Sequence, residues 1–323
     1  MESNLFLSNN VLIYLFGTTI LYVLQTIAIV YSISIIKNWD FDSTTTYQYK
    51  LEKRLYLIIL IIFFTLSINI ILLPFFAYTL DSLSLLVPGA MCAAGIISAN
   101  DYGEPLLILK LIIMFFAAVW LIINNEDLKT IDYKYTKKKI LFFVIIFMFA
   151  TIDMVLNIVY FLNISTESPV LCCSKIYGVS GISSPLPFGL DIGKSLILFY
   201  LIYILTVVVS LQKQNILMFI SNIFFIYLSY FAVVYFFGTY IYELPTHNCP
   251  FCMLQKDYYF VGYVLWGSLF LGVFFGMGSF LLKLITNKEL NFTYKYNILF
   301  NTIFVLICSL YVILYYIKNG VLL

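Results

Sequence analysis

The feature that most constrains this chain is a series of eight apolar runs, each long enough to cross a lipid bilayer. A transmembrane helix needs roughly 20 predominantly apolar residues. Such runs lie near 11–36, 55–80, 105–124, 139–163, 193–212, 216–242, 257–284 and 297–317. Because 63% of the 323 residues are hydrophobic and 11% are charged, no soluble fold of this length could bury the apolar surface. We therefore predict an all-α polytopic bundle of about eight spans, forming one integral membrane domain over 1–323.

The basic residues are divided unequally between the two sets of loops, which predicts the orientation of the chain. Loops on the cytoplasmic side of a membrane carry the excess of lysine and arginine. One side holds thirteen basic residues: Lys37, Lys50, Lys53, Arg54, Lys129, Lys134, Lys137, Lys138, Lys139, Lys213, Lys283, Lys288 and Lys295. The other side holds five: Lys110, Lys175, Lys194, Lys256 and Lys318. We expect the first set to face the cytoplasm of a bacterial-type inner membrane, with both termini extracytoplasmic. No basic block indicates nucleic-acid binding.

Three long extracytoplasmic loops, near 81–104, 164–192 and 243–256, concentrate the unusual residues of the sequence. They contain seven of the eight prolines, counting Pro105 at the start of a span, and five of the six cysteines. Prolines fix turns, so these loops are expected to form a folded Cys/Pro-rich cap. The five cysteines are Cys92, Cys172, Cys173, Cys249 and Cys252. The sixth, Cys308, falls within the last span and is expected to be a small core residue.

The pair Cys249 and Cys252 has a spacing that suits thiol chemistry. Pro250 favours the first turn of a helix, so the seventh span is expected to begin at about Cys249. Both sulfurs would then lie at a helix N-terminus, where unpaired N–H groups and the helix dipole lower the pKa of a thiol. On this hypothesis Cys249 is the attacking thiolate and Cys252 resolves the mixed disulfide. Cys172 and Cys173 would carry electrons to or from an extracytoplasmic thiol protein.

The stretch Cys249-Pro250-Phe251-Cys252-Met253-Leu254-Gln255-Lys256 resembles the Cys-Pro-Leu-Cys-x-x-Gln-Arg motif of the DsbB family. The resemblance covers eight residues. Members of that family are four-span membrane oxidoreductases that pass electrons from a thiol oxidase to quinone. The resemblance implies that Cys249 and Cys252 form the pair next to a quinone. It also implies that Lys256 stands where the family often has an arginine beside the quinone, although lysine lacks the planar guanidinium.

Two further interpretations of the cysteines remain open. Thiolates with nearby histidine and methionine favour Cu(I) or Zn(II), and such a protein would traffic metal or assemble cofactors with a metallochaperone. The ligands would come from Cys92, Cys172, Cys173, His247, Cys249 and Cys252. Alternatively, the loops are closed by structural disulfides in a non-enzymatic subunit or transporter. Five loop cysteines cannot all pair within one chain, so at least one must have another role.

Two charged residues fall inside predicted spans. Asp153 lies well within the fourth span, with Asn157 one turn later, and Lys110 lies within the third. Intramembrane acids are costly and usually functional, so Asp153 is a candidate proton relay to a quinone. Lys110 is expected to extend its ammonium to the outer interface, and a pair with Asp153 is the alternative. In the seventh span, Gly272 and Gly276 form a Gly-x-x-x-Gly pair that predicts close helix packing.

Overall fold

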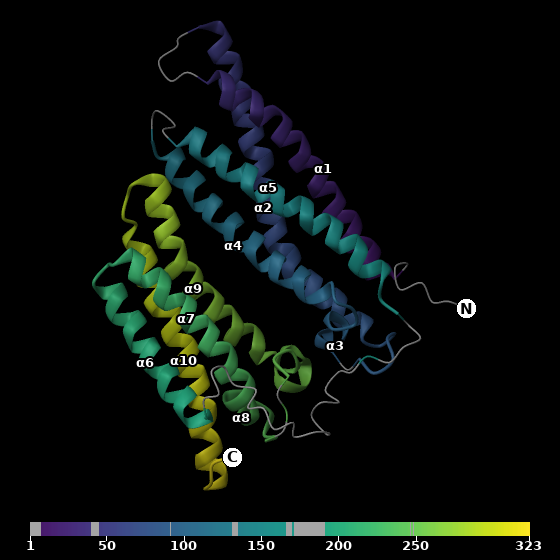
Figure 1. The fold of residues 1–323 in the computed structure, drawn as a ribbon, viewed down its shortest axis with the longest axis vertical. Coiled ribbons are helices and arrows are strands. Elements are labelled where there is room, and N and C mark those ends of the chain that lie inside the picture. Colours follow the sequence, from purple (N-terminus) through teal and green to yellow (C-terminus); the bar gives the residue numbers. More distant parts are fainter. Residues whose placement is uncertain are drawn as a thin grey trace. The chain divides into compact units, whose positions relative to one another are not determined.

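In the computed structural model, the described part of the chain folds into helices joined by loops and contains no strand (Figure 1). The described residues are 8–39, 45–90, 92–130, 135–165, 170, 191–245, 247 and 249–323. The helices are α1 Asn9–Asn38, α2 Thr46–Leu83, α3 Ala93–Ile97, α4 Gly103–Leu128, α5 Thr136–Leu162, α6 Ile192–Leu211, α7 Asn215–Ala232, α8 Gly238–Tyr242, α9 Val261–Thr286 and α10 Asn291–Asn319.

Eight helices among the described residues are long and apolar enough to cross a membrane, which confirms the predicted polytopic helical bundle. Seven of them are α1, α2, α4, α5, α6, α9 and α10. The eighth combines α7 and α8 through a π-helical turn at Val233–Phe237. Helices are the natural solution for spans because lipid cannot satisfy a backbone N–H or carbonyl. Many large apolar side chains, such as Ile13 and Phe16, are exposed on the outside of the helices, as a lipid-facing surface requires.

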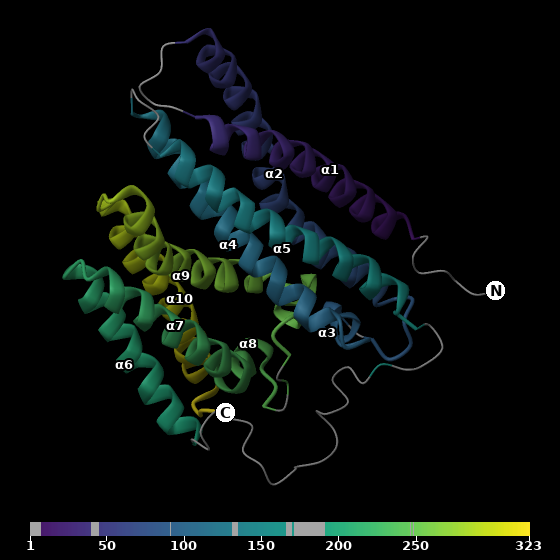
Figure 2. The same ribbon diagram turned by 45° about the horizontal axis from the view of Figure 1, so that its top comes forward.

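The chain divides into two compact units, Met1–Val170 and Leu171–Leu323, and each contains four of the eight spans. In the first unit α1 packs on α2, α2 on α4, α4 on α5, and α5 again on α1, which closes a four-helix bundle. The short α3 lies in the connection from α2 to α4. Figure 2 shows these helices running alongside one another. The prediction of one domain over 1–323 stays a prediction.

The second unit repeats this arrangement of neighbours. Here α6 packs on α7, α7 on α9, α9 on α10, and α10 on α6. In both units the connection between the second and third spans carries cysteine: Cys92 in the first, Cys249 and Cys252 in the second. The two halves therefore share an architecture that their residue patterns do not reveal.

Glycines of α9 allow the close helix packing that the sequence predicted. A Cβ atom on Gly272 would lie 2.0 Å from Oδ1 of Asn301 in α10, and one on Gly276 would lie 2.2 Å from Nδ2 of Asn222 in α7. Asn297 of α10 uses the space by donating hydrogen bonds to the carbonyl of Gly272 at 2.7 Å and to Oδ1 of Asn222 at 2.8 Å. Small residues thus let three helices meet through buried amides.

Candidate functional site: a paired-cysteine loop and an intramembrane ion pair

The loop between α8 and α9 brings the two cysteines of the second unit together. Helix α8 ends where Glu243 takes a left-handed conformation, with φ of 54°. The sulfur atoms of Cys249 and Cys252 lie within 4.8 Å of each other. Both side chains are buried, with 8% and 7% of their surface exposed. The predicted redox pair is therefore a geometric pair that lies inside the folded loop.

Tyr242 fixes the backbone around the two cysteines. Its hydroxyl donates a hydrogen bond to the carbonyl oxygen of Cys249 and accepts one from the backbone N–H of Met253 at 3.1 Å. One hydroxyl thus connects the backbone of Cys249 with the backbone of Met253, the residue that follows Cys252. Because backbone groups buried without a partner are costly, this bridge stabilises the loop against the end of α8.

The same loop is also held against α9. The indole N–H of Trp266 donates a hydrogen bond to the carbonyl oxygen of Pro250 at 3.1 Å. At Gly262 a Cβ atom would lie 2.6 Å from Cγ of Met253, so only glycine lets the loop approach this closely. Met253 itself is 1% exposed. Contacts from α8 and α9 therefore position both cysteines.

The predicted start of the seventh span at Cys249 is wrong, because α9 begins at Val261. Cys252 instead begins a single 3₁₀ turn, Cys252–Leu254, and a second turn covers Lys256–Tyr258. The chain is extended at Gln255 and left-handed at Tyr259 and Phe260, and these conformations separate the turns from the helix. The sulfurs therefore do not lie at the N-terminus of α9, and its dipole cannot supply the expected activation.

Aromatic and charged residues surround the pair within the second unit. The ring of His247 packs edge-on against Tyr242, with ring centroids 4.3 Å apart, and Tyr258 packs on the same ring at 4.7 Å. Burial, with further contributions from Cys252 and Asp257, raises the pKa of Tyr258 above its ordinary value. Lys256, the predicted quinone contact, has an exposed side chain in the second 3₁₀ turn. Its role stays a prediction.

The other four cysteines are Cys92, Cys172, Cys173 and Cys308. Cys92 is buried in the first unit, at the residue that precedes α3. Cys172 and Cys173 lie outside the described residues, so their predicted roles are untested. Cys308 is fully buried within α10, in agreement with the core position expected from the sequence.

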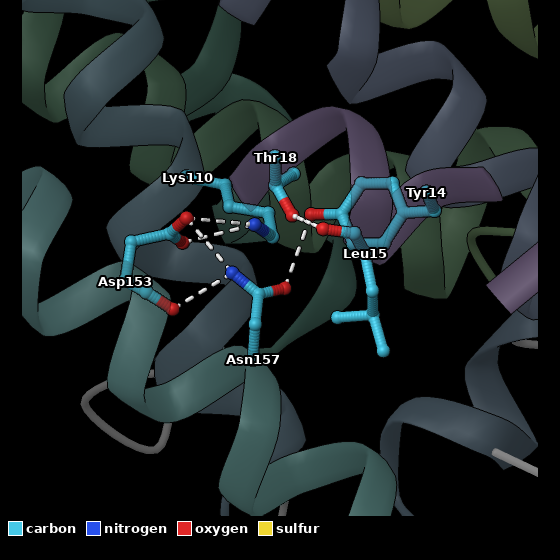
Figure 3. A network of polar contacts seen from close by, with 6 residues as sticks. All are labelled: Tyr14, Leu15, Thr18, Lys110, Asp153 and Asn157. Atoms are coloured by element: carbon cyan, nitrogen blue, oxygen red, sulfur yellow. Dashed lines mark hydrogen bonds and ion pairs between the residues drawn. The ribbon is translucent and has the colours of Figure 1, made fainter. Parts of the chain in front are cut away.

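The two intramembrane charges of the first unit form a pair. Nζ of Lys110 in α4 lies 2.9 Å from Oδ1 and 3.1 Å from Oδ2 of Asp153 in α5 (Figure 3). Their side chains are 9% and 17% exposed, so the expectation that Lys110 would extend to the interface is wrong and the pairing alternative holds. A carboxylate within the bundle is a stronger partner for an ammonium than a distant headgroup region.

Neighbouring polar and aromatic groups complete this network. Asn157 donates to Oδ2 of Asp153 at 2.8 Å and accepts from the hydroxyl of Tyr14 in α1 at 3.1 Å. The ammonium of Lys110 lies 5.3 Å from the centroid of the Tyr14 ring and 4.9 Å from that of Phe76 in α2, in two cation–π contacts. All four helices of the unit therefore contribute to one site.

A cavity of about 50 Å³ adjoins the ion pair, with Lys110, Asp153 and Gln25 among its lining residues. Gln25 is 1% exposed, and among the described residues its Nε2 has no hydrogen-bond partner. A water molecule needs about 10–15 Å³ of such space, so the cavity has room for a few waters. It is much smaller than the roughly 300–1,000 Å³ of typical ligand pockets. The predicted cofactor contact of Asp153 stays a prediction.

Sequence reasoning missed a second buried ion pair. Nζ of Lys139 lies 2.5 Å from Oδ2 of Asp127, and both side chains are fully buried. Lys139 also donates to Asn124, while its carbonyl accepts from the indole of Trp120 at 2.9 Å. Lys139 was counted among the loop cations because it follows Lys137 and Lys138. Its position at the start of a helix facing Asp127 could have indicated the pair.

These features define a class: a polytopic helical membrane protein with a paired-cysteine loop in one four-span unit and an intramembrane ion pair in the other. No protein-family model matches the chain, and no curated protein or solved structure matches it either.

Proposed function

We propose that the chain is a membrane thiol–disulfide exchange protein whose reactive pair is Cys249 and Cys252. The observation that carries this proposal is the proximity of the two sulfurs, which lie within 4.8 Å of each other in a loop held from α8 and α9. A small change in the side chains would bring them to bonding distance, about 2.05 Å. The second unit also has four spans, the number found in the DsbB family that the motif resembles.

The exchange moves two electrons. In its disulfide form, the pair accepts them when a thiolate of a partner dithiol attacks Cys249 and displaces the Cys252 thiolate. The second thiol of the partner, after losing its proton, then attacks the mixed disulfide, so the partner becomes a disulfide and Cys249 leaves as a thiolate. Reoxidation of the pair passes two electrons and two protons to an acceptor, for which we propose a membrane quinone. Both sulfurs belong to buried side chains, so we expect a partner thiol to reach the pair only when the loop opens.

The distance between the sulfurs of Cys249 and Cys252 also favours a second function, the binding of a soft metal ion. Zinc–sulfur bonds are about 2.3 Å long, so two sulfurs on one ion are at most about 4.6 Å apart. His247 belongs to the same loop and is the only histidine of the sequence. His247 stays a predicted ligand. Cys92, Cys172 and Cys173 stay predicted ligands.

One preparation distinguishes the two functions. We would purify the full chain gently without reductant, count reactive thiols with and without denaturant, and quantify copper and zinc. Exchange predicts no bound metal and a Cys249–Cys252 disulfide that mild reductant opens. Near-stoichiometric metal that is lost in Cys249→Ser would overturn exchange in favour of metal binding. Absence of both metal and disulfide would overturn both functions. Cys308→Ser is the matched control, because it removes one thiol from the core of α10.

A further inference from the structure

The second unit has a groove at the end where its two helical hairpins turn. The groove measures about 670 Å³ and is lined by the start of α7 and the end of α9. Lys213 and Lys283 contribute its cationic side chains. The two turns are joined directly, because Nζ of Lys213 donates to Oδ1 of Asn291 at 2.9 Å. This end of the unit is therefore a defined surface, separate from the cysteine loop.

Hydrogen-bond donors of α7 gather at this groove. Gln214, which precedes the helix, makes no capping hydrogen bond with its side chain, and the first backbone bond at this end runs from Met218 to Gln214. The N-terminus of a helix presents free N–H groups and a partial positive charge, both of which favour anions. Asn215 supplies an independent sign of a missing partner. It is 93% buried, and among the described residues its Nδ2 has no hydrogen-bond acceptor.

The orientation of the Asn215 amide follows from its other contact. Its Oδ1 accepts a hydrogen bond from the hydroxyl of Tyr294 at 2.9 Å, so the unpartnered atom of this groove-lining residue is the buried Nδ2 donor. An acceptor placed there would satisfy this group. One buried donor at the groove, Nδ2 of Asn215, thus lacks an acceptor.

The charge of this end is also positive. Four lysines lie in the two turns or the adjoining helix ends, against one acidic residue, Glu289. The four are Lys213, Lys283, Lys288 and Lys295. Lys213 donates its hydrogen bond to a neutral amide and forms no ion pair among the described residues, whereas Lys283 lies 2.6 Å from Oε1 of Glu289. An anion at the groove would be attracted by the first lysine and would compete with Glu289 for the second.

Four apolar side chains, those of Ile216, Leu217, Phe280 and Leu284, also line the groove and identify the kind of anion. Ile216, Leu217 and Leu284 line it and are 64%, 49% and 63% exposed. A soluble phosphate would gain nothing from these side chains. A phospholipid would place its phosphate by the lysines and the start of α7, and its acyl chains along the leucines and isoleucine. We propose that this groove binds the headgroup of an anionic phospholipid.

The predicted orientation supports this ligand. The four lysines belong to the loops that the sequence places in the cytoplasm, and the cytoplasmic leaflet is the one enriched in anionic lipid. For each of the two lysines that line the groove, Lys213 and Lys283, we expect roughly 1 kcal/mol, or about fivefold in affinity. The proposal does not depend on the chemistry of Cys249 and Cys252.

The test is a lipid titration of the full purified chain in neutral detergent, followed by native mass spectrometry and by thermal stability. Phosphatidylglycerol is compared with phosphatidylcholine of the same acyl chains. We expect at least tenfold preference for phosphatidylglycerol, and about fivefold loss for each of Lys213→Gln and Lys283→Gln. Glu289→Gln should strengthen binding because it releases Lys283. Lys295→Gln is the matched control, since it removes one charge at the same end without lining the groove.

Three outcomes would overturn the proposal. The first is equal affinity for the two lipids, and the second is an equal loss in Lys295→Gln and Lys213→Gln. The third uses inorganic phosphate alone as the probe: if phosphate binds as tightly as phosphatidylglycerol and displaces it, the groove is a phosphate site and not a lipid site. Gel filtration and unfolding temperature without lipid establish that each variant is folded. Cysteine oxidation is not read in this assay, so failure here leaves the exchange proposal standing.

Discussion

Lys110 and Asp153 are 43 residues apart in the sequence, yet their Nζ and Oδ1 atoms lie 2.9 Å apart between α4 and α5. Separation of these two charges would leave an ion in an apolar bundle, which is far more costly than losing a surface pair. The pair therefore connects the two helices of the α4–α5 hairpin in the first unit. The role of Asp153 in any proton transfer has to be compatible with this structural role.

Removing one partner of this pair should destabilise the protein more than removing both. We expect Lys110→Met or Asp153→Leu to lower the free energy of unfolding by about 3 kcal/mol, because each leaves an uncompensated buried group. The double variant should recover most of the loss. Denaturation of the purified chain in detergent measures all four proteins. Additive effects in the double variant would contradict the pairing.

Tyr242→Phe tests the bridge at the cysteine loop. The variant keeps the ring but leaves the carbonyl of Cys249 and the N–H of Met253 without their partner. We expect a loss of about 2 kcal/mol, from roughly 1 kcal/mol for each bond. The reduced Cys249 and Cys252 should also react faster with a maleimide, as read by mass spectrometry of each peptide. Tyr258→Phe, which alters a ring packed on Tyr242, is the control. Equal labelling rates in all three proteins would exclude the bridge as the element that closes the loop.

The glycines of α9 offer a test of helix packing with an internal control. Gly272→Ala would place a methyl group 2.0 Å from Asn301, whereas a Cβ on Gly267 meets nothing within 4 Å. We expect Gly272→Ala to cost about 1–3 kcal/mol through overpacking, and Gly267→Ala to be neutral or slightly stabilising. Unfolding temperatures of the two variants provide the comparison. Similar temperatures would mean that α9 and α10 can separate at no cost.

The ion pair of Lys283 and Glu289 gives a prediction for pH. The hydrogen bond from Lys283, its charge, and the charge of Lys213 hold the pKa of Glu289 below its ordinary value of 4.5. Because folding lowers the pKa of Glu289, the ion pair stabilises the folded chain fully at pH values above 4.5. This stabilisation disappears as pH falls through the lower pKa that Glu289 has in the folded chain. The difference in phosphatidylglycerol affinity between the native chain and Glu289→Gln should therefore be constant from about pH 7 to pH 5. A difference that fades within this range would show that Glu289 titrates at its ordinary value or above.

The sequence by itself determined the class of fold. Eight long apolar runs predict eight spanning helices because lipid leaves a backbone no other way to satisfy its polar groups, and this holds for each run separately. The close helix packing at the Gly-x-x-x-Gly pair and the core position of Cys308 were also predictable, because both depend on residue type and on local spacing in the sequence. The proximity of Cys249 and Cys252 also followed from their spacing of three.

Only the tertiary structure decided how separate spans contact one another. The partner of Lys110 depends on which face of α4 meets α5, and the buried Lys139–Asp127 pair depends on the packing at the start of α5. The start of α9 was misjudged because Pro250 permits a helix but does not require one. The contacts from Tyr242 and Trp266 stabilise a loop there instead, and they offset the cost of the left-handed backbone at Tyr259 and Phe260. Local preferences determine which helices form. The loop conformation and the buried ion pairs result from long-range contacts, whose free energy outweighs those local preferences.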